Sequence, residues 1–185
     1  MKLGFYGGTF DPIHNGHLIL AREAVETLGL DRLFFIPNAI SPHKTATMPA
    51  PSDLRAEMIR LAIANEPRFD LDELELNRHG ISYTIDTLIT LRERFGPKAE
   101  FYYLIGEDNV SSLATWRRIN ELRHMATFVV LCRSEHSTPL PYVTLQRRID
   151  ISATEIRKRI ANGQSIRYLV PDKVHDLIIQ NSLYQ

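Results

Sequence analysis

The sequence of 185 residues contains one cysteine, one tryptophan and no long apolar run. A single cysteine, Cys132, excludes an internal disulfide framework and a cysteine-rich zinc site. It also suits a reducing compartment, so we expect a cytoplasmic protein. The first residues lack the apolar core of a signal peptide, and no stretch approaches the roughly 18 apolar residues of a membrane span. We therefore expect no membrane partner.

Net charge is also absent, because 22 basic residues balance 22 acidic ones. Duplex nucleic acid and anionic membranes both select for a basic surplus, so we expect no nucleic-acid partner and only local anion sites. The basic residues are 17 arginines and 5 lysines, and the planar arginine side chain suits phosphate. A chain of this length can bury about 70% of its unfolded surface, which favours a single domain over residues 1–185.

Short apolar segments alternate with stretches of helical period. The predicted strands are Leu3–Tyr6, Leu33–Ile36, Phe101–Ile105 and Phe128–Cys132. The predicted helical stripes are Leu18, Ala21, Val25 and Leu28; Leu54, Met58 and Leu61; and Ile85, Leu88, Leu91 and Phe95. Strands that are apolar throughout favour a parallel sheet covered on both faces. The alternation predicts a Rossmann-like, doubly wound α/β fold with helices on both faces.

Two further helices carry boundary signals, which predict a small helical C-terminal part. Ser152 begins a capping-box pattern, Gly163 follows as a stop, and Pro171 stands where the last helix would start. Residues 37–51 and 133–141 are rich in Pro, Ser, Thr and His, and we interpret them as long functional loops.

The most informative segment is Gly7–Leu18, GGTFDPIHNGHL, between the first predicted strand and the first helix. Open α/β sheets bind nucleotides at this junction. The segment is neither a dinucleotide fingerprint nor a P-loop. Gly7 and Gly8 allow the backbone to approach a ligand closely, and Gly16 leaves room for a phosphate at the positive end of the helix dipole.

Three side chains of this segment add chemistry. Thr9 offers a hydroxyl, and His14 and His17 stand where a P-loop has its lysine, each able to donate a hydrogen bond to a phosphoryl oxygen. One alternative is a plain turn and helix cap built by Asp11, Pro12 and Asn15, with the histidines in solvent. Another is a metal site, which we rank lower because no partner cluster of ligands stands out.

The segment resembles the nucleotide-binding signature of the adenylyltransferase superfamily, which includes nicotinate-nucleotide and pantetheine-phosphate adenylyltransferases. The matching residues are Phe10, Asp11, Pro12, His14, Gly16 and His17. A second segment, Ile151–Arg157, resembles the element of that superfamily that holds the outer phosphates of ATP. Its hydroxyls and arginine at a helix start also suit an anion without the resemblance, although Ser152 and Glu155 could form a capping box with no ligand.

The resemblance implies an ATP site made of Gly7, Gly8, Thr9, Phe10, His14, Gly16, His17, Gly106, Asp108, Arg133, Ser152, Thr154 and Arg157. No nucleophilic side chain with a recognisable motif is present, so we expect direct in-line attack on the α-phosphorus of ATP. In that reaction Thr9, His14, His17 and Arg157 would be the catalytic residues. We expect Mg²⁺ held through phosphates and water, with no protein metal ligand.

Further segments resemble one branch, the bacterial nicotinate-nucleotide adenylyltransferases of NAD biosynthesis. They are PHK (Pro42–Lys44), ISYTIDTL (Ile81–Leu88) and IGEDNVSSLATW (Ile105–Trp116). The resemblance implies that nicotinate mononucleotide binds at Lys44, Tyr83, Thr84, Trp116 and Arg117, and that the product is nicotinate adenine dinucleotide with pyrophosphate. An aromatic face suits a pyridinium ring, and amide groups at a helix start suit its carboxylate.

Alternatives remain open at several of these residues. Trp116 could be plain core, Thr84 an ordinary N-cap, and Asp108 a cap after its strand. Arg133 departs from the family pattern because Ser134 and Glu135 replace the expected Pro-Gly. The acceptor could instead be nicotinamide mononucleotide or pantetheine phosphate, and a non-catalytic nucleotide-binding module is the alternative from another class. The sequence also leaves open a homo-oligomer and the role of residues 134–148.

Overall fold

The computed structural model describes every residue except 41–47, 79 and 134–140. Within that part of the chain, six strands form one parallel sheet in the order β3-β2-β1-β4-β5-β6. The strands are β1 (Lys2–Gly8), β2 (Arg32–Pro37), β3 (Phe69–Leu71), β4 (Glu100–Gly106), β5 (Thr127–Cys132) and β6 (Val143–Gln146). This strand order is that of doubly wound dinucleotide-binding folds, and the predicted fold class is confirmed.

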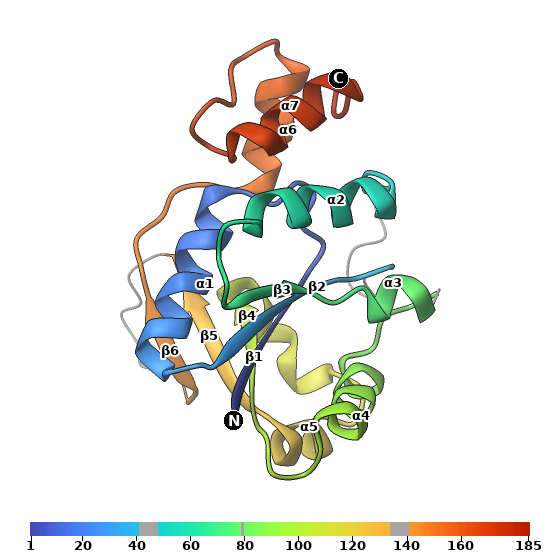
Figure 1. Cartoon of the computed structure of the whole chain (residues 1–185), viewed down its shortest axis with the longest axis vertical. Coiled ribbons are helices and arrows are strands. Elements are labelled where there is room, and N and C mark those ends of the chain that lie inside the picture. Colours follow the sequence, from blue (N-terminus) through green and yellow to red (C-terminus); the bar gives the residue numbers. More distant parts are fainter. Residues whose placement is uncertain (41–47, 79, 134–140) are drawn as a thin grey trace.

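Helices cover both faces of the sheet (Figure 1). The α-helices are α1 (Asn15–Leu28), α2 (Ser52–Ile63), α3 (Leu74–Arg78), α4 (Thr84–Phe95), α5 (Ile119–Met125), α6 (Ala153–Ala161) and α7 (Asp172–Gln180), and η1 (Glu107–Thr115) is a 3₁₀ helix. None of the helices in the described ranges is both long and apolar enough to cross a membrane.

The two faces of the sheet bury separate apolar clusters, because successive side chains of a strand point to opposite faces. On β1, Tyr6 joins the cluster under α1, α2 and α7, whereas Leu3 and Phe5 join the cluster under α4 and α5. All three side chains are at most 4% exposed. Strands buried on both faces explain the continuous apolar runs from which four of the strands were predicted.

The carboxyl-terminal helices lie beside α2 at one end of the molecule (Figure 1). Val174 and Ile178 of α7 are fully buried in the same cluster as Met58 and Ile59 of α2. The helix α6 begins at its N-cap Ser152, whose Oγ accepts a hydrogen bond of 3.2 Å from the Glu155 amide. The predicted small helical C-terminal part is therefore confirmed, and it packs on the main core.

Of the three residues predicted for the buried stripe of α2, Met58 is buried and the prediction was wrong for the other two. The buried side chains are Arg55, Ala56, Met58, Ile59 and Ile63, whereas the predicted Leu54 and Leu61 are only half-buried. The difference arises because a buried arginine replaces an apolar residue in the stripe. The two predicted long loops fall partly on residues 41–47 and 134–140, which lie outside the described residues.

Candidate active site

Two cavities open at the carboxyl ends of β1 and β4, where the strand order reverses and open α/β sheets bind ligands. Their volumes are about 830 Å³ and about 380 Å³. They share one wall, made of Gly7, Gly8, Thr9, Asn38 and Asn109. A ligand in one cavity can therefore meet a ligand in the other at this shared wall.

The larger cavity, which we call the phosphate cavity, collects residues from both predicted anion-binding segments. Its lining includes Gly7, Gly8, Thr9, Phe10, His14, His17, Gly106, Asp108, Arg133, Ser152, Thr154 and Arg157. The start of α1 and the start of α6 thus face one space, although 135 or more residues separate them in sequence. Gly16 is the one residue of the predicted ATP set that does not line it.

Two glycines of the signature are required by close contacts. A Cβ atom on Gly7 would stand 2.3 Å from the Tyr103 hydroxyl, so any side chain there would displace that ring. A Cβ atom on Gly16 would stand 3.0 Å from Nδ1 of His14 and 3.2 Å from Ile149. Gly16 therefore makes room for the His14 ring, which differs from its predicted role beside a phosphate.

His14 and His17 stack on each other at the start of α1, with ring centroids 3.7 Å apart. Nδ1 of His17 accepts a hydrogen bond of 3.2 Å from the His14 amide. His14 is only 1% exposed, and its ring nitrogens have no hydrogen-bond partner among the described residues. His14 therefore does not point into solvent, and the alternative of a plain turn with both histidines in solvent is wrong.

The pKa of His14 is lowered to about 3, first by burial and then by the positive charge of Arg133. The ring is neutral at neutral pH, so one nitrogen donates and the other accepts. An unpartnered donor beside an arginine, in a cavity, suits an anionic ligand that would satisfy both.

Arg157 reaches back from α6 to the signature segment. Its Nη1 donates a hydrogen bond of 2.7 Å to the Asp11 carbonyl and lies 3.9 Å from the Asp11 carboxylate. The same carboxylate accepts hydrogen bonds from the Tyr184 hydroxyl at 2.6 Å and from the Ala50 amide at 3.1 Å. Sequence reasoning missed Tyr184 because nothing local marks the penultimate residue of the chain as a partner of residue 11.

Arg133 also has a fixed place in this cavity. Its Nη1 donates a hydrogen bond of 3.1 Å to the Ile151 carbonyl, just before the start of α6. Its charge also acts on Tyr6 and His14. The replacement of Pro-Gly after Arg133 therefore leaves the arginine itself at the cavity wall.

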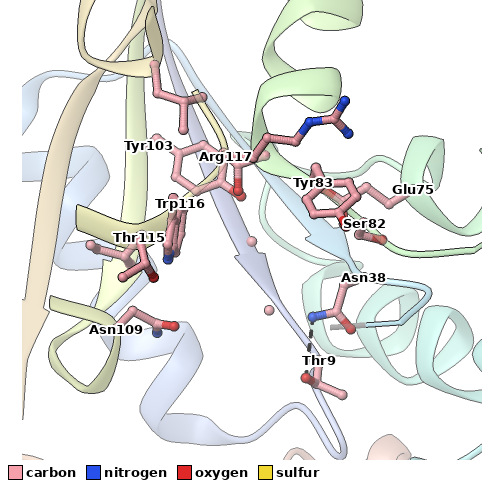
Figure 2. Close-up of a pocket in the computed structure, with 15 residues that line it drawn as sticks. Thr9, Asn38, Glu75, Ser82, Tyr83, Tyr103, Asn109, Thr115, Trp116 and Arg117 are labelled. Carbon is pink, nitrogen blue, oxygen red and sulfur yellow. Dashed lines mark hydrogen bonds between the residues drawn. The ribbon is translucent and has the colours of Figure 1, made fainter. Parts of the chain in front are cut away.

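The smaller cavity, which we call the aromatic cavity, lies between η1 and the start of α4. Tyr83 and Trp116 face it from opposite sides, and Asn38, which also lines it, donates a hydrogen bond of 3.4 Å to Thr9 (Figure 2). Thr84 and Arg117 also line it, and the Arg117 guanidinium lies 4.9 Å from the centroid of the Tyr83 ring. Lys44, also predicted at this site, lies outside the described residues.

The structure contradicts the N-cap alternative for Thr84, and it places Trp116 both against the core and in the cavity wall. The N-cap of α4 is Tyr83 and not Thr84, and Tyr83 makes no side-chain capping bond. Trp116 ends η1 and precedes α5, so it does not belong to a helical stripe with Ile119. It packs edge-on against Phe128, 6.1 Å between centroids, while it also lines the cavity.

Asp108 is likewise not the cap that the alternative required. The residue that caps η1 is Gly106, and a Cβ atom there would stand 2.4 Å from Oδ1 of Asp108. Asp108 thus folds back over a glycine at the end of β4 and faces the phosphate cavity.

Neither a metal cluster nor an activated thiol is present in the described part of the chain. No group of three His, Cys, Asp or Glu side chains there could hold a metal ion. Cys132 is fully buried at the end of β5, and burial raises the pKa of its thiol. A neutral buried thiol is a poor nucleophile.

Comparison with known proteins places these features in a family. Residues 5–159 match the model of the cytidylyltransferase-like family. The probable nicotinate-nucleotide adenylyltransferase of Geobacillus thermodenitrificans is 44% identical over 99% of this chain and 86% of its own length. The nicotinate-nucleotide adenylyltransferase of Bacillus subtilis is 38% identical over 100% of this chain and 98% of its own.

Solved structures show the same fold. The nicotinic acid mononucleotide adenylyltransferase of Plasmodium falciparum complexed with NaAD matches with a TM-score of 0.81 and 21% identity, over 99% of this chain and 97% of that one. The same enzyme complexed with APC matches with a TM-score of 0.78 and 20% identity, over 99% and 96% of the two chains.

Proposed function

The chain belongs to the nicotinate-nucleotide adenylyltransferases of the cytidylyltransferase-like family, and we propose that its phosphate cavity holds ATP and its aromatic cavity nicotinate mononucleotide. The enzyme transfers the adenylyl group of ATP to nicotinate mononucleotide, giving nicotinate adenine dinucleotide and pyrophosphate. The observation that carries the assignment of the cavities is their shared wall at Gly7, Gly8 and Thr9. It lets two mononucleotides meet at their phosphates.

The proposed reaction is a direct in-line displacement. A phosphate oxygen of nicotinate mononucleotide attacks the α-phosphorus of ATP, a new P–O bond forms, and the bond to pyrophosphate breaks. Such a transfer needs positioning and charge stabilisation more than covalent help from the protein. A phosphate cavity with no activated nucleophile among its described residues is in keeping with this.

The proposed catalytic residues are Thr9, His14, His17 and Arg157. His14, which is neutral, and His17 would donate hydrogen bonds to the α-phosphate and outer phosphate oxygens, where negative charge grows in the transition state. Thr9 lies at the shared wall and would orient the α-phosphate. Arg157 is already anchored on the Asp11 carbonyl, so a phosphate would meet a guanidinium that is partly preorganised.

The aromatic cavity supplies both halves of a nicotinate site. Trp116 offers a flat face to the pyridinium ring. The start of α4, which lacks a side-chain cap, offers amide groups and the positive end of a 12-residue helix to the carboxylate. Lys44 and the backbone of Arg117 complete the proposed acceptor set.

Magnesium would enter with the triphosphate. The carboxylates that line the phosphate cavity are Asp11, Glu107 and Asp108, and they form no three-residue cluster with other described ligands. A cation there would be held by phosphate oxygens and water, and it would neutralise charge on the leaving pyrophosphate.

We propose further that residues 1–185 act as one domain. Support comes from α7, which shares its buried cluster with α2 and the central strands. A cytoplasmic location would place the enzyme beside its co-substrate ATP.

The proposed function is tested by pyrophosphate release with ATP and Mg²⁺ and three acceptors in turn: nicotinate mononucleotide, its amide, and pantetheine phosphate. We expect the highest kcat/KM with nicotinate mononucleotide. Preference for pantetheine phosphate would overturn the acceptor, and no release with any of the three would overturn the activity. In that case the protein would be a nucleotide-binding module.

Replacing Trp116 with alanine should raise KM for nicotinate mononucleotide about tenfold, because aromatic stacking on a ring contributes roughly 1–3 kcal/mol. KM for ATP should hardly change, since Trp116 lines only the aromatic cavity. Trp116→Phe keeps an aromatic face, so its KM for nicotinate mononucleotide should lie between the values of the wild type and Trp116→Ala. Steady-state kinetics with each substrate varied in turn measures this, and an unchanged acceptor KM would assign Trp116 to the core alone.

A further inference from the structure

The aromatic cavity has an acidic side chain that the proposed reaction does not use. Glu75 of α3 lines this cavity and is only 5% exposed. Its Oε1 accepts a hydrogen bond of 2.6 Å from the fully buried Thr87 hydroxyl. A second hydroxyl, that of Ser82, also bonds to it. The carboxyl group is thus held rigidly inside the wall of a ligand site.

Glu75 lies against the start of α4, which is the proposed binding place of the nicotinate carboxylate. Ser82 immediately precedes the Tyr83 N-cap, and Thr87 is in the first turn of the helix. Glu75 lies beside Ser82 and Tyr83 (Figure 2). A bound nicotinate would therefore bring a second carboxyl group to the same helix end, beside a carboxyl group that is itself almost fully buried.

Arg78 is the cation whose charge favours the ionised form of Glu75, and it forms no ion pair with Glu75 among the described residues. Asp72, just before α3, is ion-paired with Arg94 of α4, and Asp86 of α4 lies 4.0 Å from Arg117. Arg78 of α3 directs its nitrogens to the hydroxyls of Thr87 and Thr90, each at 3.4 Å.

The remaining neighbour is Tyr103 of β4, a buried phenol whose pKa is raised by burial and by Glu75. Among the described residues no lysine or arginine forms an ion pair with Glu75, and His79 lies outside them. Burial raises the pKa of Glu75 and is the largest effect, and the negative charge of Asp72 acts in the same direction. Hydrogen bonds from Thr87 and Ser82 and the positive charge of Arg78 lower the pKa in part.

We propose that Glu75 is a specificity-determining residue that couples the binding of a pyridine carboxylate to the uptake of one proton. Two carboxylates that share one buried site do not both ionise readily. Nicotinate mononucleotide therefore binds as the anion when Glu75 takes a proton from solvent, whereas the amide ligand carries no second charge and needs no such proton. The preference for acid over amide falls as pH rises. This inference rests on the acceptor site of the proposed function.

The test uses the fluorescence of Trp116, which is the only tryptophan of the chain and lines the cavity. Nicotinate mononucleotide and nicotinamide mononucleotide are titrated separately, without ATP, between about pH 6 and pH 9. The two ligands share the ring, ribose and phosphate, so the ratio of their dissociation constants cancels the titration of the phosphate.

In the wild-type protein, the ratio of the acid's Kd to the amide's Kd should rise with pH. Only the protonated fraction of Glu75 is competent to bind the acid, so the slope approaches about tenfold per pH unit above the pKa of Glu75. In Glu75→Gln the ratio should stay flat. Glu73→Gln, which changes a half-buried glutamate paired with Arg60 at 2.8 Å, should keep the wild-type slope.

Thr87→Val provides a second variant in case Glu75→Gln does not fold. It removes a donor that favours the ionised carboxylate, so the rise in the ratio should begin at higher pH. A flat wild-type ratio, or equal slopes in the wild type, Glu75→Gln and Thr87→Val, would overturn the coupling alone. Absence of fluorescence change with both ligands would overturn the acceptor site and the coupling with it.

Discussion

Replacing His17 with alanine should lower kcat at least about a hundredfold, because removal of one preorganised donor to a transition-state anion typically costs that much. The geometry of the ring supports this. Nδ1 of His17 accepts a hydrogen bond from the His14 amide, so in the neutral imidazole the proton is on Nε2. The protein therefore fixes the tautomer that presents Nε2–H as the donor.

Stacking on His14 fixes the orientation of the His17 ring as well. A donor whose direction and tautomer are both set before the substrate arrives needs no reorganisation during the reaction. The effect of the substitution should accordingly fall on kcat, with a much smaller change in KM for ATP.

Single-turnover and steady-state pyrophosphate release would measure the effect. His124→Ala is the matched control, since that histidine is exposed in the last turn of α5, and it should keep wild-type turnover. His17→Gln places an amide donor near the position of Nε2 and should recover part of the loss. Near-normal turnover of His17→Ala would show that the residue only supports the start of α1.

Local sequence was sufficient for the parts of the fold that are buried on both faces. The strands β1, β2, β4 and β5 occupy the centre of the sheet, so each is an unbroken apolar run. The strand β3 has three residues with Asp70 at its middle, and β6 is an edge strand with one buried residue, Leu145. Their pairing is set by neighbouring strands more than by their own sequence, and neither was predicted.

The same distinction holds for the site. Most residues of the predicted phosphate set lie in two short motifs, each at a helix start, and a motif is visible in sequence. Glu75 and Tyr184 act through partners that the fold brings to them. Tyr184 and Asp11 are 173 positions apart, and no periodicity or spacing reports such a pair.

Replacing Arg55 with alanine should destabilise the protein by about 3 kcal/mol and lower the Tm by roughly 6–12 °C. Arg55 is 1% exposed. Its Nη1 donates a hydrogen bond of 2.7 Å to the Thr9 carbonyl, and its Nε donates one of 3.0 Å to the Ala50 carbonyl. It thereby joins Thr9, just after β1, to Ala50, just before α2.

The size of the effect follows from what alanine would leave behind. Two carbonyls would lose their charged donor inside the fold, and each unsatisfied buried group costs about 1–3 kcal/mol. Burial lowers the pKa of Arg55, and the charge of the Asp11 carboxylate opposes this. That carboxylate would lose a nearby cation. Part of the cost is recovered where water enters the phosphate cavity, which Arg55 lines.

Thermal unfolding of Arg55→Ala and Arg60→Ala measures whether the loss of stability comes from the buried hydrogen bonds of Arg55 or from the loss of any arginine in α2. Arg60 is on the same helix with 53% of its side chain exposed, and it forms surface ion pairs with Glu57 and Glu73. Exposed pairs contribute little, so Arg60→Ala should change stability by less than about 1 kcal/mol. Equal Tm shifts in the two variants would contradict the assignment.

Turnover is a second test of the role of Arg55. The Thr9 carbonyl that accepts its hydrogen bond belongs to a residue of the wall shared by the two cavities. Below its lowered Tm, Arg55→Ala should remain folded and still lose activity, since the turn that aligns two phosphates would no longer be fixed. Arg55→Lys keeps the charge but not the two-directional reach of the guanidinium. It should therefore recover more stability than turnover.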